Sequence, residues 1–137
     1  MKKILFIIVT LFILQCLNSQ TIHIRATRYA YSEIINNDFE EWSEWDTANV
    51  IILINLDNST ITIDNQYGDK FYLRTLITTG NKKDNDGDTY KYFEYRCYDQ
   101  NDKSCTIDLN SWDNYNIYHL YIYYSNVRYV YEGNIID

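Results

Sequence analysis

Hydrophobic and polar residues alternate along residues 89–109, which give the clearest structural signal in the chain. In residues 90–98, Tyr95 has an apolar side chain two positions away on each side, whereas the positions directly beside it carry charge. This period of two predicts a strand with one buried face. Residues 99–104 have the composition of a turn, and a second alternating run follows at 105–109. The sequence therefore predicts a β-hairpin.

The position of the turn sets the register of this hairpin. With the turn centred on Asn101, the opposed pairs are Cys97 with Cys105, Tyr95 with Ile107 and Phe93 with Leu109. A shift of one residue would place Tyr95 opposite a polar residue and would separate the thiols. Opposed Cβ atoms lie about 4.5–5.5 Å apart, and modest adjustment of the strands brings them within reach of a disulfide. We therefore predict a Cys97–Cys105 disulfide.

Six more alternating or continuously apolar runs predict further strands. They lie at residues 21–31, 49–56, 60–65, 70–78, 117–124 and 127–131. A two-residue turn at Asn58 and Ser59 would pair Leu56 with Ile61. Residues 79–89 form the longest polar run and predict a loop.

Residues 38–46 do not alternate. Phe39, Trp42 and Trp45 recur at every third position, as on one face of a short helix, which we predict before the second strand. Three glutamates surround the tryptophans: Glu40, Glu41 and Glu44. Glycosidases use two carboxylates that flank the sugar, so this segment supports glycan binding or glycan hydrolysis as an alternative function. A charged, solvated helix face explains the same residues.

Eight short strands joined mostly by short turns predict an all-β fold. No helix of crossover length separates the strands, so consecutive strands are expected to be antiparallel neighbours in a meander. A sheet of this size must curl or split to bury its apolar face. The result is either a barrel-like fold or a two-sheet sandwich, and we expect a single domain over residues 20–137.

Residues 1–19 have the features of a secretory signal peptide. Two lysines precede the apolar run 4–14, and Ser19 offers a small residue for cleavage. The apolar run is too short for a stable transmembrane span. Lipid anchoring at Cys16 is disfavoured, because Gln15 rather than a small residue precedes it. We expect export to the periplasm or the extracellular space, where disulfides form, with no transmembrane segment after cleavage.

The chain that remains after residue 19 is acidic and rich in tyrosine. It keeps 10 of the 12 basic side chains and all 19 acidic ones, which gives a net charge of −9. This charge disfavours nucleic acid as a partner, because phosphate binding needs a basic surface. All 15 tyrosines remain, and tyrosine favours strands and gives binding surfaces a large contact area.

Few residues follow the pattern of a catalytic or cofactor site. The two histidines, His23 and His119, lie in predicted strands without a metal-ligand spacing, and glycine-rich phosphate loops and Gly-x-Ser-x-Gly elbows are absent. We predict a non-catalytic binding module without a cofactor, whose partner is an unknown small molecule, glycan or protein. The candidate ligand-binding residues are Tyr95, Ile107 and Tyr121 for an interior pocket, and Trp42 and Trp45 for a surface.

Asp84, Asp86 and Asp88 form a D-x-D-x-D pattern whose carboxylates could wrap a calcium ion. The glycine of an EF-hand loop would follow the third acid, where Thr89 stands, and the distal glutamate is missing. Asp86 and Gly87 also make a good hairpin turn. A weak calcium site and a plain turn are both consistent with these residues.

The order of these features resembles the layout of small lipocalin-like secreted bacterial proteins. That layout is a signal peptide, then an entry segment with tryptophan, then a meander of strands. The resemblance implies a barrel whose interior takes a ligand. The Gly-x-Trp signature of lipocalins is absent from this chain, so the resemblance assigns no functional residue.

Overall fold

The computed structural model describes residues 21–136, which form one antiparallel sheet closed into a barrel. The strands are β1 (Thr21–Ile35), β2 (Asp38–Phe39), β3 (Asp46–Asn55), β4 (Thr60–Ile63), β5 (Asp69–Lys83), β6 (Thr89–Asp99), β7 (Ser104–Trp112), β8 (Ile117–Tyr123) and β9 (Val127–Ile135). One 3-10 turn, η1 (Asp113–Tyr115), precedes β8. The predicted all-β meander is confirmed. No helix in this part of the chain has the length and apolar character that crossing a membrane requires. The predicted signal peptide and Cys16 lie outside the described residues.

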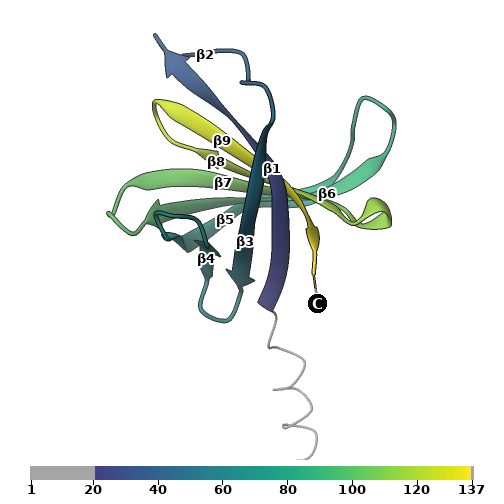
Figure 1. Ribbon diagram of the computed structural model, residues 1–137. Helices are drawn as coiled ribbons and strands as arrows, with labels where there is room; N and C mark the ends of the chain where they lie inside the picture. The colour runs from purple at the N-terminus through teal and green to yellow at the C-terminus, as the bar shows by residue number, and fades with distance from the viewer. Residues whose placement is uncertain (1–20, 137) are drawn as a thin grey trace, which may run out of the picture.

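The barrel closes because β1 pairs with two strands. It pairs with β3 along one edge and with β9 along the other, while all other neighbours follow chain order. The short β2 adds to the far end of β1 and lies outside the ring of eight. Figure 1 shows β1 and β3 passing in front of β7, β8 and β9 at a steep angle. Closure decides between the two predicted architectures in favour of the barrel.

Bulges bend the two longest strands around the barrel. In β1 the register shifts between Ala26 and Arg28, and it shifts at two places in β5. An extra residue on one strand increases the local twist and lets a long strand turn a corner. Both strands are 15 residues long, longer than the other strands of the barrel, and the bulges let them follow its curvature.

Alternate residues of each strand face the interior, and the alternation changes phase at the bulges of β1 and β5. The buried residues of the interior are Ile24, Ala26, Ile52, Ile54, Ile61, Ile63, Phe71, Cys97, Cys105, Ile107, Leu120 and Ile122. In β8, Ile122 pairs with Ile107, so the even-numbered residues face the interior. His119 and Tyr121 therefore face outward. β-branched side chains predominate because they fit the pleated, buried face of a strand.

The predicted register of the β6–β7 hairpin is confirmed. Cys97 lies opposite Cys105, and the other two predicted pairs, Tyr95 with Ile107 and Phe93 with Leu109, also form. The two cysteines are free thiols here, with Sγ atoms 3.1 Å apart, beyond the roughly 2.05 Å of a disulfide bond. The structure thus brings the predicted partners together without showing the bond between them.

The predicted helix over residues 38–46 is wrong. Asp38 and Phe39 form β2, and residues 40–45 are an irregular connection into β3. The backbone N–H groups of Glu40 and Ser43 donate to carbonyls of β1 at 2.9 and 2.8 Å. The hydrogen bonds that a helix would make within itself therefore go to the neighbouring strand.

Two predicted turns also need correction. Residues 79–83 belong to β5 rather than to a loop, because they pair with the start of β6. The turn after β3 spans four residues instead of two, so Ile61 pairs with Ile54 rather than with Leu56. Asn55 Oδ1 accepts the backbone N–H of Asn58 at 3.1 Å and holds this wider turn. The shift of two residues keeps the paired side chains on their predicted faces, but Leu56 falls in the turn and is exposed.

Replacement of Gly133 by alanine is expected to destabilise the protein by about 3 kcal/mol or more. A Cβ at this position in β9 would lie 2.1 Å from the carbonyl oxygen of Arg25 in β1, so the barrel seam would have to open. Urea unfolding followed by circular dichroism measures the change. The control is Gly68→Ala, where φ is +61° and no atom lies within 4 Å, with an expected cost of about 1 kcal/mol. Equal costs for the two variants would contradict the close seam.

Candidate functional site

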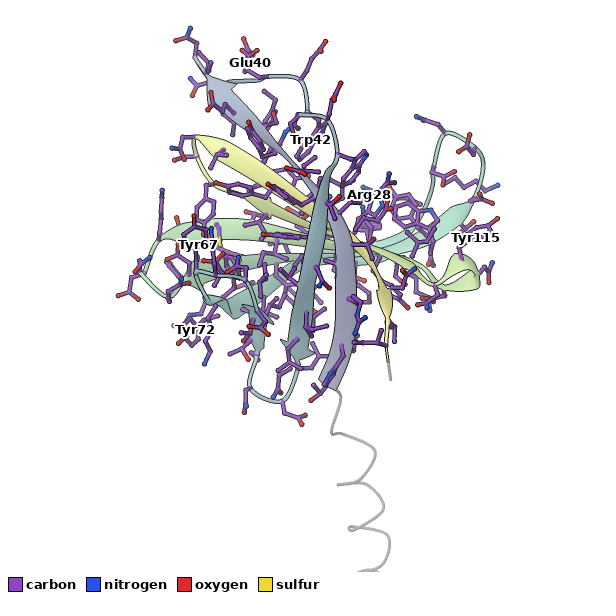
Figure 2. The ribbon with its side chains drawn as sticks, in the orientation of Figure 1. Arg28, Glu40, Trp42, Tyr67, Tyr72 and Tyr115 are labelled. Carbon is purple, nitrogen blue, oxygen red and sulfur yellow. The ribbon has the colours of Figure 1, made fainter. Side chains whose placement is uncertain are left out.

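A cavity of about 600 Å³ opens at one mouth of the barrel. Phe71 and Ile122, which are 2% and 3% exposed, belong to both its lining and the core. Five tyrosines line it as well: Tyr29, Tyr67, Tyr124, Tyr129 and Tyr131. The rim comes from the start of β3 and from the β4–β5 connection, whose Tyr67 is 75% exposed. Figure 2 shows Tyr67 on the left of the barrel.

The polar groups of this cavity are held by hydrogen bonds. The Tyr124 hydroxyl donates to Asp99 Oδ2 at 2.9 Å. Asp69 accepts from the side-chain amides of Asn65, at 2.8 Å, and Gln100, at 3.3 Å. Burial, and then the contact with Asp99, raise the pKa of Tyr124 far above its usual value. The hydroxyl is therefore a protonated donor at neutral pH.

The lining of this cavity consists mainly of aromatic, apolar and amide side chains. Among the described residues that line it, Asp69 is the one charged side chain. The arrangement is suited to binding, with ring faces for contact and a few amides and hydroxyls for orientation.

The three residues predicted for an interior pocket do not come together. Ile107 is fully buried in the core, and Tyr95 opposite it is half-buried on the same inner face. Tyr121 points outward, because it pairs with Asp108 rather than with Ile107. None of the three lines the barrel mouth. A ligand role for them stays a prediction without support from their positions.

The aromatic residues of segment 39–45 pack against the outside of β8. The ring pairs are Phe39 with Tyr123, Trp42 with Tyr121 and Trp45 with His119, with centroids 6.5, 6.0 and 6.3 Å apart. The β8 residues recur at every second position, as outward-facing residues of a strand must. Every third residue of the irregular segment therefore contacts every second residue of β8. This match explains why a helical pattern arose without a helix.

Segment 39–45 also covers apolar residues on the outer face of the barrel. Ala30 and Val130 are paired across β1 and β9, and they are 2% and 3% exposed although they lie outside the main core. Ser32, on the same face, donates its hydroxyl to the Glu40 carbonyl at 2.6 Å. The barrel therefore carries a second, smaller apolar cluster beneath this segment.

The geometry of this segment does not form a glycan-hydrolysing site. The Arg128 guanidinium lies 4.2 Å from the Trp42 ring centroid, and that of Arg28 lies 4.4 Å from the Trp45 ring centroid. Ring faces that would stack on a sugar are thus in contact with arginine. The segment's glutamates, Glu40, Glu41 and Glu44, are all exposed, and Figure 2 shows Glu40 at the outer tip. No pair of them faces the other across a groove, which hydrolysis requires.

The aspartates predicted as calcium ligands form a tight turn between β5 and β6. Asp84 Oδ1 accepts the backbone N–H groups of Asp86 and Asp88 at 3.0 and 2.9 Å. Its Oδ2 accepts the Trp112 indole N–H at 2.9 Å. Within residues 21–136 no group of three His, Cys, Asp or Glu side chains could hold a metal ion. Calcium binding here stays a prediction, and the observed bonds are those of the alternative, a plain turn.

Asp108 is a half-buried carboxylate on the outer face, beside Tyr121 and opposite Glu94. Its Oδ1 is buried and has no hydrogen-bond partner within the described chain. Burial, and then the charge of Glu94, raise its pKa to about 6, although Lys82 acts in the opposite direction. The folded protein therefore holds this proton more tightly than the unfolded chain.

Asp108→Asn is expected to raise the free energy of unfolding at pH 7 by about 1 kcal/mol, after a discount for solvent screening. A raised pKa in the fold means that the native carboxylate costs stability as the pH rises from about 4 to about 6. The gain should therefore shrink at pH 4, which urea unfolding at both pH values measures. Asp57→Asn in the exposed turn after β3 is the control. A gain that is the same at pH 4 and pH 7 would contradict the raised pKa.

Sequence reasoning missed most of the barrel-mouth residues. Tyrosines are frequent in residues 115–131, but the sequence does not assign their faces, because rings occur on both faces of β8. The pairing of Ile122 with Ile107 was the missing signal, since it sends the even-numbered positions of β8 inward.

Comparisons with protein-family models, curated proteins and solved structures found no match to this chain.

Proposed function

We propose that the protein is an exported, non-catalytic binding module that holds a small apolar or aromatic ligand in its barrel mouth. The observation that carries this proposal is the cavity of about 600 Å³ with its five tyrosines. Ligand pockets are typically about 300–1,000 Å³ in volume and are lined by hydrophobic and aromatic side chains with a few polar groups. The barrel mouth meets each of these conditions.

The lining favours a neutral ligand with a flat ring. Phe71 and Ile122 provide apolar contact, and Tyr129 and Tyr131 add ring faces and hydroxyls. The carboxylate of Asp69 already accepts two amide hydrogen bonds. An anionic ligand would lose its hydration without meeting a cation, which costs free energy. One or two hydrogen-bonding groups on the ligand would meet the amides of the rim.

Export and a Cys97–Cys105 disulfide belong to the same proposal. The features of residues 1–19 support export, and an oxidising compartment would favour a bond between the two thiols. Their opposed positions in β6 and β7 support the pairing. The bond would tie the hairpin that contains Asp99, the acceptor of the Tyr124 hydroxyl at the cavity.

The neutral fluorescent probe N-phenyl-1-naphthylamine is expected to bind the barrel mouth with an increase in fluorescence. Val50 is half-buried and lines the cavity, so Val50→Phe should reduce the free volume and weaken binding about tenfold. Fluorescence titration of the folded protein measures both affinities. Tyr72→Leu is the control, because Tyr72 is partly exposed on β5 and lies outside the cavity (Figure 2). No fluorescence increase, or equal affinities for wild type and Val50→Phe, would contradict the proposal.

Protein secreted by its host and purified without reductant is expected to contain the disulfide. Its mass should be lower than that of the reduced protein by two hydrogen atoms. Closing this short loop should stabilise the fold by about 2.5 kcal/mol, so reductant should lower the melting temperature. The double variant Cys97→Ala, Cys105→Val should show no response to reductant. Two free thiols in the secreted protein would overturn this part of the proposal.

A further inference from the structure

A second hollow of about 350 Å³ lies on the outside of the barrel, away from the proposed ligand cavity. It is lined by Asp84, Asp88, Trp112, Tyr115, Ile117, His119 and Glu132. The β5–β6 turn, η1 and the outward faces of β8 and β9 therefore meet here. Figure 2 shows Tyr115 on the right of the molecule and Tyr67, at the barrel mouth, on the left.

Each carboxylate of this hollow is held by a neighbouring side chain. Asp84 accepts the Trp112 indole N–H at 2.9 Å, and Asp88 accepts the Tyr115 hydroxyl at 3.1 Å. Glu132 bonds His119 Nε2 at 2.6 Å through one oxygen. These contacts fix the carboxylates against the rings that form the walls, so the site is largely preformed.

The hollow has an excess of negative charge. Three carboxylates line it, and among residues 21–136 no lysine or arginine does. Arg28 pairs with Glu132 at 2.7 Å from outside the lining, whereas no cationic side chain of this described part of the chain pairs with Asp84 or Asp88. Desolvation opposes the charged form of Asp84, but the bonds from Trp112 and from the turn backbone outweigh it and lower its pKa. Asp84 is therefore ionised at neutral pH.

Aromatic rings supply the other half of the site. Tyr115 is 56% exposed and offers an uncovered ring to the hollow. Trp112 is held in place by stacking on Tyr90, with centroids 4.6 Å apart, and by the His119 ring at 4.9 Å. Rings beside carboxylates are the surroundings in which proteins bind organic cations, because the ring quadrupole attracts positive charge.

We propose that this hollow binds an organic cation with an alkylammonium group. Its walls give the cation both ring contact at Tyr115 and Trp112 and charge compensation at Asp84 and Asp88. A bare metal ion suits it less well, because the oxygens of Asp84 already accept three hydrogen bonds. The alkylammonium group could belong to a free small molecule or to a methylated lysine side chain, which presents the same chemistry.

Choline and its neutral isostere 3,3-dimethylbutan-1-ol test the proposal on the intact protein. The readout is the Trp112 indole N–H resonance in two-dimensional NMR, assigned with Trp112→Phe. Choline should shift this resonance in a saturable way, with half-saturation on the order of 1 mM. The isostere, which has the same shape without the charge, should leave it unchanged. A peptide with trimethyllysine distinguishes the two sources: tighter binding than choline assigns a protein side chain, and weaker binding assigns a free cation.

Variants at the two ends of the site separate binding from folding. Tyr115→Leu and Asp88→Asn should each weaken choline binding about fivefold or more. Tyr72→Leu, an exposed tyrosine outside both hollows, should not change it. The proposal is overturned if choline gives no saturable shift up to about 20 mM. It is equally overturned if choline and its isostere act alike, or if Tyr72→Leu weakens binding as much as Tyr115→Leu.

Discussion

The structure depends on the pairing of β1 with β9, which turns a meander into a closed barrel. At this seam Gly133 lies opposite Ala26, beside the bulge of β1, and its Cα hydrogens face the Arg25 carbonyl at a distance that no Cβ could share. Closure leaves no exposed edge along the ring of eight strands. It also gives the sheet an inside and an outside, and along each strand inward-facing residues alternate with outward-facing ones.

The division into two faces creates two different environments from similar residues. On the inside, isoleucines fill the barrel, and tyrosines gather at the mouth where their hydroxyls reach polar groups. On the outside, rings of segment 39–45 lie against Arg28 and Arg128 and against rings of β8. Aromatic side chains can serve in both places because one part is apolar and the other, in tyrosine and tryptophan, is polar.

Part of the outer face of the barrel is covered by segment 39–45. Segment 39–45 buries Ala30 and Val130, and Arg128 is placed between the Phe39 and Trp42 rings at 4.1 and 4.2 Å. A guanidinium can stack on ring faces and still donate hydrogen bonds, and here Arg128 donates to the Glu40 carbonyl at 3.2 Å. The connection between β2 and β3 is thereby fixed to the barrel without regular secondary structure.

The sequence by itself determined eight of the nine strands in outline, all but β2, and it determined the β6–β7 register, since alternation and the apolar pairs from Phe93 to Leu109 allow one alignment. The error at the turn after β3 removes only Leu56 from the expected core, because a shift of two residues keeps the other side chains on their faces. Tertiary structure alone decided the path of segment 39–45, whose aromatic spacing fits a helix as well as it fits contact with β8. It also decided that Tyr124, just after β8, and Tyr129 and Tyr131 of β9 line the mouth, because both faces of β8 carry rings and its pairing with β7 alone shows which face is inside. Local pattern specifies that a strand has two faces, but only pairing with distant strands specifies which face is inside.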